Sequence, residues 1–192
     1  MDRLYKTPFL LLVKEGMARD FPGFAPIKVA RGEPDAEVFA SALVYCLEAR
    51  PGHAVWIWWQ PGPGVERRFM VFVGWSPSPG VLPVHGQHDP RIYSLQGPTP
   101  AFPACSLSLE QVLGRSAMAG FDIPSPWDRL HQLKPATPRA EQKRVMQQAA
   151  AEAAAMTPEE RTAAIRGIVG EVLALLRSVI PSFMTPPARS GT

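Results

Sequence analysis

The most regular pattern in the chain is an alternation of large apolar residues over two neighbouring segments. Residues 53–60 are rich in aromatic and β-branched side chains, which suit the pleated surface of a strand. A Pro/Gly turn follows, and residues 67–75 continue the alternation. Trp56 and Trp58 share one face of the first segment, and Trp59 lies on the other. The pattern predicts a β-hairpin with two apolar faces, each of which needs a cover.

Three further segments extend the predicted sheet. Residues 24–31 alternate apolar and polar side chains, which is typical of a strand. Residues 37–48 fit the helical and the strand period, so periodicity leaves both structures open. We favour a strand there, because Pro51 and Gly52 would form a short turn into the Trp-rich strand. With a short strand at 91–95, we expect an antiparallel meander of four or five strands.

Long helices are predicted at both ends of the chain. The first covers 7–20, with Thr7 as its cap and Pro8 at its first helical position. A polar, alanine-rich helix follows over 137–156, and the last helix covers 157–181, beginning with a capping box and ending at its proline. Apolar side chains recur three and four residues apart in the last helix: Ile165, Ile168, Val169, Val172, Leu175, Leu176 and Val179. This stripe is expected to pack against another element.

The middle of the chain reads as an ordered, proline-rich connector. Ser108 with Gln111 three residues later predicts a capped short helix, and residues 125–128 predict another turn of helix. Taken together, the elements predict one α+β domain over 1–185, in which an N-terminal helix and C-terminal helices pack on the sheet. Residues 186–192 are expected to form a frayed tail.

Composition limits the classes of function. The formal net charge is +3, but Lys and Arg never cluster beyond a pair, whereas a nucleic-acid-binding face normally concentrates them. No apolar run approaches the roughly 18 residues of a membrane span. The apolar run 8–13 is too short for a signal peptide. Two cysteines do not make a disulfide framework, which indicates a reduced compartment. We expect a cytoplasmic protein with no membrane partner, and nucleic acid is not the favoured ligand.

The densest group of metal-ligand side chains is His85, His88 and Asp89, to which Cys105 could add a fourth ligand. A Pro/Gly loop does not aim two imidazoles at one point, so exposed loop residues are the simpler interpretation. Cys46 lies in an apolar run and is expected to be a buried, inert thiol. A metal-dependent or thiol enzyme that uses His85, His88, Asp89 and Cys105 is the alternative function. For the favoured function we predict no metal and no cofactor.

The hairpin supplies the predicted binding residues. Arg67 and Arg68 stand beside the tryptophans, a combination that could neutralise and stack on single-stranded nucleic acid. The same arginines equally describe the charged flank of a strand, which we favour. If one face of the hairpin stays open, the predicted binding surface consists of Trp56, Trp58, Trp59, Arg67 and Arg68.

Several segments together resemble small uncharacterised bacterial proteins in which helices flank a meander sheet. They are the strand 69–76 after its Trp-rich partner, the strand Arg91-Ile92-Tyr93, the turn at Trp127, and the helix closing on Ile180-Pro181-Ser182-Phe183. Some proteins of this kind are immunity partners that bind and block secreted antibacterial toxins. The resemblance implies a non-enzymatic protein-binding protein with a toxin as its partner, and it brings no site residues of its own.

Overall fold

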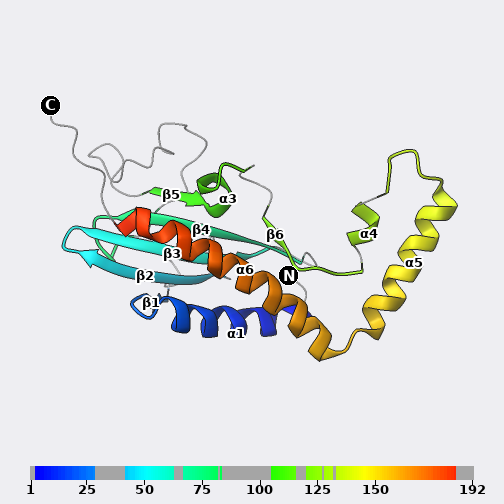
Figure 1. Ribbon diagram of the computed structural model, residues 1–192, viewed down its shortest axis with the longest axis horizontal. Helices are drawn as coiled ribbons and strands as arrows, with labels where there is room; N and C mark the ends of the chain where they lie inside the picture. The colour runs from blue at the N-terminus through cyan, green and yellow to red at the C-terminus, as the bar shows by residue number, and fades with distance from the viewer. Residues whose placement is uncertain are drawn as a thin grey trace.

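A computed structural model describes residues 3–28, 42–62, 67–81, 83, 105–115, 120–126, 128–131 and 133–184. They form an α+β structure in which an N-terminal helix, the strands of a sheet and the C-terminal helices follow one another along the chain (Figure 1). The elements are α1 (Arg3–Asp20), β1 (Ala25–Ile27), β2 (Leu43–Arg50), β3 (His53–Pro61), β4 (Arg68–Ser76), β5 (Cys105–Ser108), α3 (Leu109–Val112), β6 (Phe121–Asp122), α4 (Asp128–His131), α5 (Arg139–Ala155) and α6 (Pro158–Met184). The predicted fold class is confirmed.

The sheet is an antiparallel meander in the order β1-β2-β3-β4-β5, with β6 also paired to β4. Pro51 and Gly52 make the tight turn between β2 and β3, where Gly52 has a φ of 80° that glycine adopts without a steric penalty. Residues 37–48 fitted both a helix and a strand, and the structure shows a strand, β2, from Leu43 onward. Residues 37–41 lie outside the described residues.

Strands β5 and β6 share the outer edge of β4. Strand β5 pairs with residues 72–75, and β6 pairs with Arg68 and Phe69 at the other end. The turn into α3 is closed as predicted, because the Ser108 hydroxyl accepts from the Gln111 N–H while the Gln111 side chain accepts from the Ser108 N–H. The predicted strand 91–95 and the Trp127 turn residue lie outside the described residues.

Strict alternation gives the hairpin its two apolar faces, as predicted. One face carries Tyr45, Val55, Ile57, Trp59, Phe69, Val71, Val73 and Trp75, all buried in the main core. The other carries a second buried cluster of Val44, Cys46, Ala54, Trp56, Trp58 and Phe72. Trp58 stacks on Phe72 with ring centroids 5.0 Å apart. Trp56 donates its indole N–H to the Ser76 hydroxyl at 2.7 Å.

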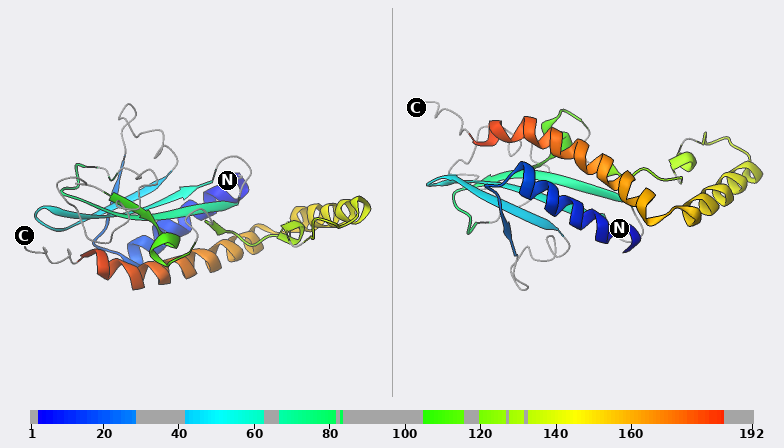
Figure 2. Two further views of the ribbon diagram at one scale, coloured as in Figure 1. Left: turned by 90° about the horizontal axis from the view of Figure 1, so that it is seen from above. Right: turned by 60° about the horizontal axis from the view of Figure 1, so that its bottom comes forward.

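Helices α1 and α6 pack together on the same face of the sheet (Figure 2). Both helices therefore cover the face that carries Trp59 and Phe69. Phe9 of α1 reaches the sheet, with its ring 4.8 Å from that of Phe69 and 6.3 Å from that of Trp59. Gly16 lets α1 approach α6 closely, because a Cβ at that position would collide with Leu173. No described helix covers the face that carries Trp56.

Two predicted helix boundaries are wrong, and both involve proline. Helix α1 begins at Arg3 and contains Pro8, and α6 continues past Pro181 to Met184. A proline removes one backbone hydrogen bond, but tertiary contacts keep the last turn of α6 helical. The Phe183 ring lies 5.5 Å from that of Trp75, and His53 donates from Nε2 to the Phe183 carbonyl oxygen at 2.7 Å.

Helix α5 extends away from the sheet, and its main contact is with α4 (Figures 1 and 2). We call α4 and α5 together the arm. Residues 139–155 of α5 are all described, and Ala149 alone among them is buried. None of the helices in the described segments is both long and apolar enough to cross a lipid bilayer.

Candidate functional site

The arm is fixed to the sheet by Arg67, which immediately precedes β4. Its Nη2 lies 2.9 Å from Asp128 Oδ1 and its Nη1 donates to the Ile123 carbonyl oxygen at 2.6 Å. The Arg67 side chain is only 15% exposed, so its charge is held in a fixed position. Asp128 in turn accepts from the Ser125 N–H at 2.7 Å, which closes the first turn of α4. Helix α4 is therefore tied to the sheet at its first residue.

The neighbouring residue, Arg129, ties α5 to α4. Its Nη1 lies 2.7 Å from Glu152 Oε1, and Gln148 donates to the same oxygen at 3.0 Å. The Arg129 and Gln148 hydrogen bonds hold the pKa of the Glu152 carboxyl below its usual range. At the end of α5, Arg161 donates to the Met156 carbonyl oxygen at 2.7 Å. Adjacent residues of α4 thus link the sheet on one side and α5 on the other.

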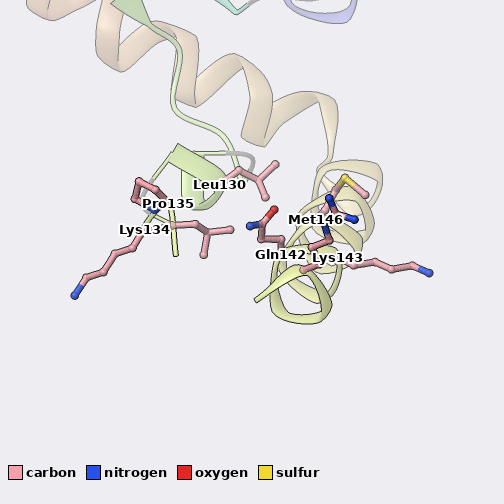
Figure 3. A pocket seen from close by; sticks show the side chains of 8 residues that line it. Leu130, Lys134, Pro135, Gln142, Lys143 and Met146 are labelled. Carbon is pink, nitrogen blue, oxygen red and sulfur yellow. The ribbon is translucent and has the colours of Figure 1, made fainter. Parts of the chain in front are cut away.

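A groove of about 560 Å³ lies between α4, the residues that follow it, and α5. It is lined by Leu130, Leu133, Lys134, Pro135, Arg139, Gln142, Lys143 and Met146. Figure 3 shows Gln142 and Leu130 extending into the space between the two segments. Gln142 is held there because its amide donates to the Thr137 carbonyl oxygen at 2.8 Å. Met146 is 47% exposed, which is unusual for a large apolar side chain in the described structure.

The charged side chains among the described residues that line this groove are all basic. Arg139, Lys143 and Met146 are spaced four and three residues apart, so they share one face of α5, while Glu141 is turned away from it. Lys134 supplies a further cation from the opposite side, and Figure 3 shows Lys134 and Lys143 extending outward on opposite sides of the groove. Within the part of the chain that the structure describes, none of these three cationic side chains forms an ion pair. Their charges are available to an external anion.

The predicted tryptophans do not form an exposed surface. Trp56, Trp58 and Trp59 are 0%, 1% and 0% exposed, respectively. Trp59 lies in the main core, and Trp56 and Trp58 lie in the second buried cluster, so a role for these indoles in binding stays a prediction. The reason for their low exposure is hydrophobic burial. Folding removes a large apolar area of each indole from water, and each face of the hairpin carries a buried cluster. Base stacking on these indoles would require a buried cluster to be uncovered.

The two arginines of the predicted surface are engaged within the molecule. Arg67 pairs with Asp128, and Arg68 makes a two-pronged contact with Asp122 at 3.1 and 3.2 Å. Both act as the charged flank of a strand, the interpretation favoured from the sequence. A nucleic acid would have to displace a carboxylate from each guanidinium.

Most of the candidate residues for the enzyme alternative lie outside the described residues. His85, His88 and Asp89 fall outside the described residues, and of Cys105 only the backbone, in β5, is described. Burial, assisted by the negative charge of Glu48, raises the pKa of the Cys46 thiol to about 12, so the thiolate needed for nucleophilic attack is scarce at neutral pH. Among the described residues no group of three His, Cys, Asp or Glu side chains is placed to hold a metal.

The groove residues were not singled out from the sequence. The signal available in the sequence was a pair of larger apolar residues, Val145 and Met146, in a polar and alanine-rich helix that has no continuous apolar stripe. The opposite wall consists of Leu130, in the four-residue helix α4, and of Leu133, Lys134 and Pro135, whose sequence carries no periodic pattern. Comparison of this chain with protein-family models, with curated proteins and with solved structures finds no match.

Proposed function

We propose that the protein is a non-enzymatic protein-binding protein that engages its partner through the groove of the arm. The observation that carries the proposal is the exposure of α5: of its 17 residues, Ala149 is the buried one. A helix of this kind adds little to the hydrophobic core, since most helical stability in proteins comes from packing an apolar face. The Arg67–Asp128 contact ties α4 to the sheet, and the Arg129–Glu152 contact ties α5 to α4, so α5 is connected to the sheet through α4. A fixed, unburied helix beside an apolar groove has the form of a docking surface.

The finer proposal is that the partner is a secreted antibacterial toxin and that this chain is its immunity protein. It is supported by the resemblance of the sheet and helix segments to proteins of that kind. A binding role needs no catalytic group, and the basic groove supplies a surface for such a partner. The metal-dependent or thiol enzyme keeps its candidate residues, His85, His88, Asp89 and Cys105, as an alternative.

Photo-crosslinking from the groove tests the proposal. A photoreactive amino acid is placed at Met146, and a matched one at Ala174, which is exposed on α6 away from the arm. The proposal expects one dominant crosslinked protein at Met146, absent at Ala174, that binds the unmodified chain at a fixed stoichiometry after purification. Equal crosslinking from both positions, or none from either, would contradict it.

The immunity class needs a separate experiment. A toxin gene adjacent to the gene of this chain would be expressed with and without the protein, and growth would be measured. Protection by the unmodified chain that is lost on replacement of Lys143 by Glu would support toxin neutralisation through the groove. Protection that survives this replacement would assign the toxin contact to another surface.

A further inference from the structure

The groove combines an apolar floor with an uncompensated positive rim. Leu130, Leu133 and Met146 supply apolar surface, and Lys134, Arg139 and Lys143 supply the charge. None of the described residues that line the groove is acidic. Lys and Arg stems lie along apolar surface while their charged ends reach past it, so such a rim extends the apolar floor as well as framing it. A ligand that fits must offer apolar side chains in the middle and negative charge at both margins.

We infer that the groove accepts an acidic amphipathic helix of the partner protein, an inference that rests on the proposed protein-binding function. The face of α5 from Arg139 to Met146 is roughly 10 Å long at 1.5 Å rise per residue. Two turns of a docking helix match that length. Apolar residues three and four apart on the helix would reach Leu130 and Met146, as in helix-in-groove recognition. Methionine suits this position because its flexible thioether adapts to the side chain it meets.

Charge complementarity favours carboxylates over other partners. Carboxylates flanking the apolar stripe of the docking helix would come within reach of Lys134 on one rim and Lys143 on the other, which Figure 3 shows extending on opposite sides. Arg139 adds a planar group that carboxylate oxygens can engage in pairs. Because these cations form no ion pair with a described residue, binding requires no internal carboxylate to be displaced.

The lining also distinguishes a protein helix from a single-stranded nucleic acid. Nucleic-acid grooves of that class place aromatic side chains under successive bases. The part of the groove lining that the structure describes contains no aromatic residue, and the tryptophans of the hairpin are buried. Aliphatic and thioether groups instead complement the leucine-type side chains of an amphipathic helix.

Fluorescence anisotropy with defined probes tests the inference on the full chain. The probe is a labelled peptide with leucines three and four residues apart and glutamates between them. Its controls are the same peptide with lysine for each glutamate and an oligothymidylate of equal length. We expect the acidic peptide to bind at least about tenfold more tightly than either control, a difference of about 1.4 kcal/mol. A lysine peptide or an oligothymidylate that binds as tightly as the acidic peptide would overturn the inference.

Variants locate the binding. Lys143→Glu is expected to weaken the acidic peptide about tenfold, and Met146→Ser to weaken it several-fold. Arg166→Glu makes the same charge change at an exposed position of α6 and should leave the affinity within about twofold. Circular dichroism confirms that each variant keeps its helices. Equal weakening by Lys143→Glu and Arg166→Glu would show attraction by net charge alone and would overturn the assignment to the groove.

The crosslinking and peptide-binding results together distinguish the acidic-helix inference from the protein-binding function. A partner crosslinked specifically from Met146 together with no preference for the acidic peptide would refute the acidic-helix inference and leave the protein-binding function in place. Absence of any specific crosslink from Met146 would refute the function itself, whatever the peptide does.

Discussion

Gly16 sets the distance between the two long helices of the core. A Cβ at this position would collide with the Leu173 side chain, which is 2% exposed and has little room to move. We expect Gly16→Ala to lower the free energy of unfolding by about 1–3 kcal/mol, because overpacking outweighs the helix preference of alanine. Urea unfolding followed by tryptophan fluorescence measures the change.

Gly167 provides the matched control for this substitution. It lies in α6, it is exposed, and a Cβ added there meets nothing within 4 Å. Gly167→Ala should therefore raise the free energy of unfolding by about 0.5–1 kcal/mol, the usual gain for alanine over glycine inside a helix. Stabilisation by both substitutions would mean that α1 and α6 are less closely packed than described.

Asp20 joins the same two helices through charge. Arg19 donates to Asp20 Oδ1 at 2.7 Å and to Oδ2 at 3.0 Å, and Nη1 of Arg177 in α6 lies 3.5 Å from the same Oδ2. The Arg19 hydrogen bond is the main reason that the pKa of Asp20 is lowered from its usual 3.8. A group with a lowered folded pKa stabilises the fold above its unfolded pKa, and that contribution is lost as the pH falls through the folded pKa.

Substitution of Asp20 by Asn isolates this contribution. At about pH 6, Asp20→Asn should lower the melting temperature by about 1–3 °C, a range set by the modest strength of ion pairs near the surface. The difference between the two proteins should shrink as the pH is lowered from 4 toward 2, where the native carboxyl is also protonated. Calorimetry across this range measures it, and a difference that stays constant with pH would contradict the assigned role.

At the scale of elements, the sequence was sufficient to predict those structures that a short-range pattern of residues determines. The period-two alternation around Trp56 and Trp59 predicted the hairpin and its two faces, since successive side chains of a strand must point to opposite sides. The caps at Ser108 and Thr157 were likewise predictable, because each satisfies backbone N–H groups within one turn. The ends at Pro8 and Pro181 were not, because packing decided them.

The placement of the arm could not be predicted for the same reason. Helix α5 was expected from its composition, but it lacks the continuous apolar stripe that would assign it a partner. Its position depends on Arg67 with Asp128 and on Arg129 with Glu152, pairs separated by 61 and 23 residues. No local period carries such information. The groove depends on these long-range contacts, so no pattern in the sequence indicates it. The Trp-rich hairpin was predicted as the binding surface because its alternation is a local pattern.

Glu152 offers a test of how the arm is held. Glu152→Gln should speed amide hydrogen exchange in α5 about two- to fivefold, because the charge-assisted contact with Arg129 weakens while α6 keeps its packing. Acid should have the same effect on the native chain. Since Arg129 lowers the pKa of Glu152 below 4.5, the contact persists at pH 4.5 and is lost as the pH falls further.

Glu171→Gln is the control for the arm experiment. Glu171 is exposed in the middle of α6, and the same loss of charge there should leave exchange in α5 unchanged. Exchange is followed by mass spectrometry of peptides covering 139–155, with peptides from 158–184 as an internal reference. Acceleration in both helices, or in neither, would count against a specific attachment through Glu152.

The whole molecule divides into a core closed by its two end helices and an arm attached at a few points. The closure is long-range: His53 bonds to the carbonyl of Phe183 across 130 residues, and Phe183 packs on Trp75. Loss of these contacts should unfold sheet and helices together, since α1, α6 and one sheet face share a single core. The arm, with Ala149 as the buried residue of α5, adds little to that cooperative unit.

A double-variant cycle tests this division. Phe183→Ala should lower the global free energy of unfolding by about 3–5 kcal/mol, as expected for removing a buried aromatic ring that is 4% exposed. Glu152→Gln should leave the global transition unchanged, and the double variant should equal the sum of the two changes within about 0.5 kcal/mol, because the residues share no contact. Coupling larger than about 1 kcal/mol would show that arm and core unfold as one unit. In that case α5 could not serve as an independent docking element, because partner binding at Met146 would depend directly on the stability of the sheet.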